Sequence, residues 1–180
     1  MNLKIFVGLT ILITAISCNR GCYSSHEFVT RMNYVVTNTA KVAQEFYASN
    51  AWMKNGQVKG VREPESYKIA YDFLNTNSRE AYLESTALDL AALFTTVKQA
   101  ENKRMDHYCW HTPSRRCKIF SKTNDRVAEN VAWASNIRSC DWAIIAWIVD
   151  DGQPQRGHRN NIFGKDKQTG LSSDGYYYSQ

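Results

Sequence analysis

The chain has 180 residues, of which 43% are hydrophobic and 12% aromatic, and its formal net charge is +5. That length predicts one domain, or one domain preceded by a processed segment. The lysines and arginines are scattered, with no run longer than two, so the charge pattern disfavours the continuous basic stripe that a nucleic-acid-binding protein presents.

The first residues are typical of a secretion signal. A positively charged MNLK precedes the thirteen uncharged residues IFVGLTILITAIS, a run too short to cross a bilayer but suited to the core of a signal peptide. The small residues Ala15 and Ser17 place cleavage after Ser17, so residues 1–17 are predicted to be removed and the protein to be secreted. A buried N-terminal helix and lipid attachment at Cys18 are the alternatives. No other segment is long and apolar enough to cross a membrane.

Secretion makes disulfide pairing the default for cysteines. The sequence contains an odd number of them: Cys18, Cys22, Cys109, Cys117 and Cys140. One is therefore left free, lipidated or shared with another chain. The pairing among the last four is open, although Cys109 and Cys117 are close enough in sequence to close a local loop. No CxxC pair occurs, which disfavours a metal site built from thiols.

The first half of the chain reads as helical. Apolar residues recur at helical spacing from His26 to about Tyr47, and residues 50–61 read as a loop with two glycines. Pro64, flanked by glutamates, predicts a helix start, and the helical spacing continues to Leu74. A third helix is predicted from about Ser85 to Lys103.

The second half is less regular. Residues 107–126 are predicted to be irregular, and residues 127–135 to form a short strand. The apolar run at 141–149 fits either a helix or a strand, and the terminal GYYYSQ fits one short strand. Helices followed by strand-like segments indicate an α+β or α/β sandwich.

Two adjoining blocks resemble a known family. RGHRNNIF at 156–163, preceded by AWIVDDG at 146–152, resembles the signature of the CAP superfamily, which includes cysteine-rich secretory proteins, venom antigens and plant pathogenesis-related proteins. The IVDDG and RGHR combination is similar to the bacterial and protist branch. Three weaker matches occur in the family's order: AENVAWAS at 128–135, HTPS at 111–114 and the opening helix at 28–46.

The resemblance covers about residues 26–163 and implies a fold. It implies a CAP/SCP-like domain at 26–180, after a short segment at 18–25. It further implies a three-layer α-β-α sandwich with a small antiparallel sheet. Only seventeen residues follow Phe163, so that sheet can be incomplete. Ala128 stands where the family has glycine, and alanine would be strained there if the position needs a positive φ.

The resemblance also implies a cleft lined by two histidines and two acids, which in some family members holds a divalent metal. Carried over, these residues are His111, Glu129, Asp150 and His158, with His107 a rival for His111 and Asp151 a rival for Asp150. Two imidazoles and two carboxylates are a reasonable ligand set for zinc, or they could form a proton-sharing network. The sequence contains neither a G-x-S-x-G elbow nor an HExxH motif.

These observations predict a secreted CAP/SCP-domain protein that acts as an extracellular binding or interaction module. Its ligand would be a lipid, a sterol or another extracellular molecule, and no cofactor is required beyond the metal that the cleft could hold. One alternative is a divalent-metal-dependent hydrolase that uses the four cleft residues on peptide or cell-wall material. Another is a degenerate structural domain. The oligomeric state is left open.

Overall fold

The computed structural model describes residues 25–49, 64–122, 127–134, 140–164 and 173–178. The predicted signal peptide at 1–17, nearly all of the segment at 18–25 and the predicted loop at 50–61 lie outside these residues. The described part contains seven helices and two strands: α1 (Ser25–Thr37), α2 (Thr39–Ser49), α4 (Pro64–Thr76), α5 (Thr86–Asn102), α6 (Pro113–Ser121), β1 (Glu129–Ala134), α7 (Cys140–Val149), α8 (Gly157–Phe163) and β2 (Ser173–Tyr178).

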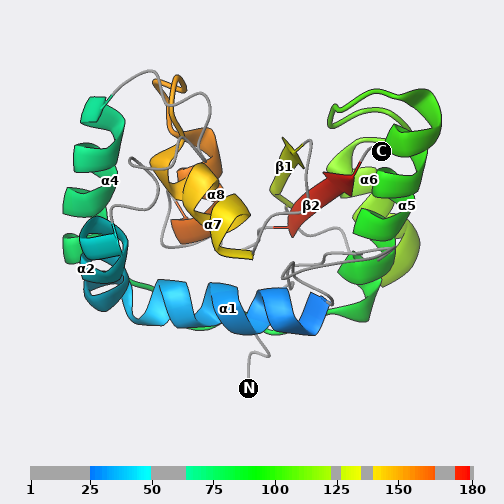
Figure 1. The fold of residues 1–180 in the computed structure, drawn as a ribbon. Coiled ribbons are helices and arrows are strands. Elements are labelled where there is room, and N and C mark those ends of the chain that lie inside the picture. Colours follow the sequence, from blue (N-terminus) through cyan, green and yellow to red (C-terminus); the bar gives the residue numbers. More distant parts are fainter. Residues whose placement is uncertain (1–24, 50–63, 123–126, 135–139, 165–172, 179–180) are drawn as a thin grey trace.

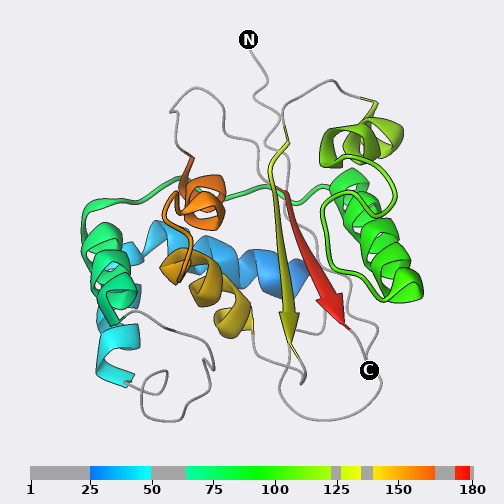
Figure 2. The ribbon, with the colours of Figure 1, turned by 90° about the horizontal axis from the view of Figure 1, so that it is seen from above.

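The predicted α-β-α sandwich with an antiparallel sheet is wrong. Helices dominate the described part, and its only sheet is the pair β1–β2, which is parallel, with Glu129 opposite Ser173 and Ala134 opposite Tyr178. From above, the two strands run side by side in the same direction (Figure 2). The reason lies in the connection, because α7 and α8 separate the strands in sequence and such a helical crossover lets the second strand run parallel to the first.

The predicted helices in the first half are confirmed, with one correction. α4 begins at Pro64. α5 spans nearly all of the predicted third helix and ends at Asn102, followed by its C-cap Lys103 in a left-handed conformation with φ 50°. The predicted opening helix is divided at Asn38 into α1 and α2. There the side chains of Thr37 and Asn38 bond to the carbonyls of Asn33 and Tyr34, and such side-chain bonds compete with the backbone ladder and bend helices.

The prediction of irregular structure at 107–126 is wrong for its centre, where α6 forms. Thr112 caps α6 by accepting a hydrogen bond from the backbone N–H of Arg115 at 3.3 Å, and Pro113 occupies the first turn. A proline is well tolerated there, because that position has no intrahelical N–H bond to lose. The strand predicted at 127–135 is confirmed as β1, and the terminal strand as β2.

The ambiguous apolar run at 141–149 is a helix, α7, and it forms the centre of the core. Seven of its ten residues are buried, from Cys140 to Val149. Buried side chains of α1, α4 and α8 pack around it. Figure 1 shows α1 along one side of the molecule, α4 and α5 at opposite ends, and α7, α8 and β1 between them. Burial on nearly every side explains why this run carries no amphipathic pattern.

Two features bear on the predicted environment of the protein. Neither Cys109 nor Cys117 forms a disulfide in the described part of the chain, so the predicted local loop between them is not closed by one. Within the described ranges, no helix combines the length and apolar character needed to cross a membrane.

Candidate functional site

His158 and Asp150 form the first half of the candidate site. Asp150 directly follows α7 with φ 51°, a left-handed conformation that aspartate tolerates better than most residues. Its buried carboxylate lies 2.6 Å from Nδ1 of His158 through Oδ1. Oδ2 accepts hydrogen bonds from the backbone N–H groups of His158 at 2.8 Å and Arg159 at 3.4 Å. The carboxylate thus caps the N-terminus of α8, where free amides and the helix dipole favour negative charge.

Two arginines fix the turn that brings Asp150 to α8. Buried Arg159 donates to the carbonyls of Ile148 and Val149, and Arg156 donates to those of Val149 and Asp150. These carbonyls are at or next to the end of α7, where helices leave such groups unpaired. Burial lowers the pKa of Arg159 to about 10, and the charge of Arg156 acts in the same direction, while Asp150 opposes it. Arg159 and Arg156 therefore anchor the turn between α7 and α8 through backbone carbonyls.

His107 and Glu129 form the second half. Oε1 of Glu129 lies 2.9 Å from Nδ1 of His107, and the Glu129 side chain is 6% exposed. Oε2 of Glu129 accepts a hydrogen bond from Arg116, which is itself buried. Arg116 also donates to the backbone carbonyls of His107, at 3.0 Å, and of His111. One guanidinium therefore holds both the acid and the loop that carries its histidine.

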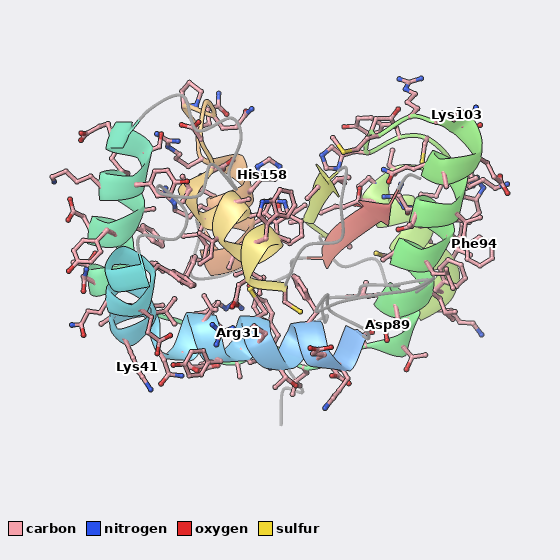
Figure 3. The ribbon with its side chains drawn as sticks, viewed as in Figure 1. Arg31, Lys41, Asp89, Phe94, Lys103 and His158 are labelled. Carbon is pink, nitrogen blue, oxygen red and sulfur yellow. The ribbon has the colours of Figure 1, made fainter. Side chains whose placement is uncertain are left out.

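Strand β1 connects the two halves, because successive residues of a strand point to opposite faces. Glu129 contacts His107 and Arg116, whereas the next residue, Asn130, donates to the carbonyl of His158 at 3.1 Å. Asn161, one turn after His158, donates to Oδ1 of Asn130 at 2.8 Å and to the carbonyl of Glu129 at 3.5 Å. Figure 1 shows β1 between α8 and the end of the molecule formed by α5 and α6. Figure 3 shows His158 near the centre of the molecule.

Three of the four predicted site residues thus share one hydrogen-bonded network. Glu129, Asp150 and His158 belong to it, but His111 contributes only a carbonyl oxygen. The His111 ring instead lies against Trp110, with 4.6 Å between ring centroids. His107, the rival to His111, makes the contact with Glu129.

The adjacent aspartates Asp150 and Asp151 act on different residues. Asp150 contacts His158, whereas the charge of Asp151 acts on Tyr67. Burial, with Asp151 as the smaller cause, raises the pKa of Tyr67 to about 12. Ala128 is not among the described residues with a positive φ, so the backbone strain considered for an alanine at this position does not arise.

Sequence reasoning missed Arg116, Asn130 and Asn161. The two asparagines stand inside the AEN and RGHRNNIF blocks, so their position beside the predicted Glu129 and His158 was a usable signal. Arg116 lies in a segment that was predicted to be irregular, and no motif in the sequence indicated that it belongs to the site. Its role depends on α6, which turns the side chain into the core.

The two histidines share one protonation pattern. An ionised carboxylate only accepts hydrogen bonds, so Nδ1 of each imidazole donates to its carboxylate, and Nε2 has a lone pair for a ligand when the ring is neutral. The side chains of His107 and His158 are 40% and 31% exposed. Among the described residues, neither Nε2 has a hydrogen-bond partner, so each can contact a ligand while the buried carboxylate holds Nδ1.

A metal ion fits this arrangement only in part. Metal-binding histidines commonly donate their other ring N–H to a carboxylate, as both imidazoles do here. However, across the described ranges no group of three or more His, Cys, Asp or Glu side chains could hold an ion. Glu129 and Asp150, expected as ligands, instead accept hydrogen bonds from the imidazoles. The four predicted residues therefore do not assemble as a closed four-ligand site.

Comparison with known proteins identifies no relative. No protein-family model matches the chain, and neither a curated protein nor a solved structure matches it.

Proposed function

We propose that the chain is a secreted binding module related to the CAP superfamily, which contacts its ligand through His107 and His158. One observation carries the proposal: each of these imidazoles has Nδ1 against a buried carboxylate and leaves Nε2 for a ligand. A lipid or sterol, or another extracellular molecule, is the class of ligand that the family resemblance implies.

The arrangement of the motifs supports the relationship. The IVDD and RGHRNNIF blocks meet at Asp150 and His158, and the AEN block joins them through Asn130. Blocks that are separated in sequence but resemble one family signature are therefore combined in one network. That is the arrangement expected if they act together, although the surrounding fold is not the predicted sandwich.

Nuclear magnetic resonance of histidine-labelled protein tests the site directly. Long-range proton–nitrogen spectra distinguish ring tautomers, and we expect His107 and His158 to be Nδ1–H tautomers when neutral. Added Zn²⁺ should shift Nε2 of both residues. The exposed His26, which pairs with Glu84, provides the matched control, since His26→Ala should leave those shifts unchanged. Zinc shifts that persist unaltered in His158→Ala would contradict a shared site.

Extraction tests the identity of the ligand. Secreted protein is purified without detergent, extracted with organic solvent and analysed by mass spectrometry. We expect a lipid or sterol from the wild-type chain and less of it from the His107→Ala/His158→Ala double variant. Equal amounts from both proteins would place the lipid elsewhere in the molecule.

A metal-dependent hydrolase is the second candidate, because two imidazoles leave coordination positions open where four protein ligands would close them. Hydrolysis of peptide or cell-wall substrates that EDTA abolishes, and that His158→Ala also abolishes, would support it. Hydrolysis that survives both treatments would exclude this site as its source.

A further inference from the structure

Helix α5 has an exposed apolar side in addition to its buried one. Its buried face comprises Leu88, Ala91, Ala92, Thr95 and Gln99. Leu90, Phe94 and Val97, at positions i, i+4 and i+7, are 40%, 42% and 42% exposed. That spacing puts the three side chains in one row on the helix, which we call the apolar stripe. Figure 3 shows Phe94 on the outer side of α5, directed away from the body of the molecule.

An aromatic cluster extends the apolar stripe toward α6. Phe94 stacks on Trp110, with 5.4 Å between centroids and 25° between ring planes. It also contacts Phe120 of α6, at 5.2 Å between centroids. The three rings therefore form a continuous aromatic surface between the two helices.

Helix α6 adds positive charge next to this cluster. Arg115, Lys118, Ile119 and Lys122 occupy positions i, i+3, i+4 and i+7 and are exposed, so they share one side of the helix and its C-cap, which we call the basic face. Helix α6 contains no acidic residue. Within the described part of the chain, none of these three cations has an ion pair, whereas Lys98 of α5 is paired with Glu101 at 2.6 Å.

We propose that the apolar stripe and the basic face together dock on an anionic lipid bilayer. Aromatic and aliphatic side chains flanked by Lys and Arg suit the boundary between headgroups and acyl chains, where the apolar groups insert and the cations meet anionic lipids. This surface lies on α5 and α6 and does not include His107 or His158, so the inference goes beyond the proposed ligand site and stands apart from it.

Charge and shape favour a bilayer over other occupants. A second copy of the chain docked through the same surface would bring its own basic face opposite this one, since a two-fold interface pairs identical patches. The apolar stripe lies on the outer side of a helix, which can enter a planar surface without rearrangement. The chain's net charge of +5 adds long-range attraction to an anionic membrane.

Vesicle flotation with the full chain tests the proposal. We expect binding to vesicles of phosphatidylcholine with phosphatidylserine, little binding to phosphatidylcholine alone, and weakening as salt rises. The triple variant Arg115→Gln/Lys118→Gln/Lys122→Gln should weaken partitioning about 100-fold, from roughly a fivefold loss for each cation. Phe94→Ala should weaken it on the order of 10-fold through lost apolar insertion.

The control is a matched pair of exposed residues on α4, Lys68 and Ile69, at the opposite end of the molecule. Lys68→Gln/Ile69→Ala should bind vesicles as the wild type does, and residues 1–24 are common to every variant. Circular dichroism melts confirm that each protein is folded. The triple variant Arg115→Gln/Lys118→Gln/Lys122→Gln should leave the zinc shifts of His107 and His158 unchanged, which separates this proposal from the ligand site.

Three results would overturn the proposal. The first is absence of binding to phosphatidylserine vesicles. The second is equal loss of binding in the α4 control. The third is binding of a polyglutamate peptide by the same surface without binding of vesicles, which would make the partner an acidic protein.

Discussion

Replacing Arg116 with methionine should be among the most destabilising single changes in the molecule. Arg116 is 1% exposed, and its partner carboxylate on Glu129 is 6% exposed. Methionine preserves much of the side-chain volume but removes the positive charge and all the donors. Among the described residues, the buried Glu129 carboxylate would then have His107 as its one remaining side-chain partner.

The expected magnitude follows from what remains unpaired. Removing one partner of a buried ion pair typically costs about 3–5 kcal/mol, because the other charge is left without compensation. The carbonyls of His107 and His111 lose the same donor, and each carbonyl left unsatisfied costs about 1–3 kcal/mol unless water replaces it. With water at the two carbonyls, the loss of the ion pair remains, and we expect the free energy of unfolding to fall by about 4 kcal/mol.

Urea unfolding, followed by circular dichroism, measures this loss. The double variant Arg116→Met/Glu129→Gln should recover part of it, because no uncompensated charge then remains buried. Arg115→Met is the matched control on the exposed side of α6 and should change stability by less than about 0.5 kcal/mol. A loss below about 1 kcal/mol in Arg116→Met, or strictly additive effects in the double variant, would refute the buried ion pair.

The other predictions concern separate parts of the fold. Asp150→Ala should lower stability by about 3 kcal/mol in urea, because α8 loses its cap and His158 its charged partner, whereas Asp150→Asn should cost less. Trp147 is buried and its Nε1 has no hydrogen-bond partner among the described residues, so Trp147→Phe should cost at most about 1.5 kcal/mol against about 3–5 kcal/mol for Trp147→Ala. The pKa of Tyr67 is raised from about 10 to about 12, so between these pH values its phenol stays protonated in the folded state but ionises in the unfolded state. The free energy of unfolding should therefore fall as the pH rises through this range. Urea unfolding at a series of alkaline pH values should show a smaller fall for Tyr67→Phe. Thr112→Ala should lower the free energy of unfolding by about 1 kcal/mol, because α6 loses its N-terminal cap.

Local signals in the sequence were sufficient for several elements. α4 begins at Pro64 as predicted, and α5 lies within the predicted range 85–103. Both predictions succeed because helix starts and apolar spacing depend on neighbouring residues. Asp150 and His158 were instead named through the family resemblance, and they are eight residues apart and joined by a short turn. Their pairing needs little beyond that turn and the start of α8.

The predictions for α6 and for the direction of the sheet were wrong, because both depend on contacts between residues far apart in the sequence. The segment that forms α6 was predicted to be irregular because its many basic residues show no apolar helical pattern. Its buried side contains Arg116 and Cys117. The sheet was expected to be antiparallel, but a helical crossover separates its two strands, and the direction of pairing depends on that path.

By itself, the sequence determined the helical stretches that form α1, α2, α4 and α5 and the positions of the two strands, because these depend mainly on neighbouring residues. Asp150 and His158 were named through the family resemblance. Only the tertiary structure decided that His107, and not His111, contacts Glu129. The two histidines are four residues apart and chemically identical, and the choice depends on Arg116, which holds the carbonyls of both while it binds the carboxylate. Such a choice rests on how α6 packs against β1, and no local pattern of residues encodes that packing.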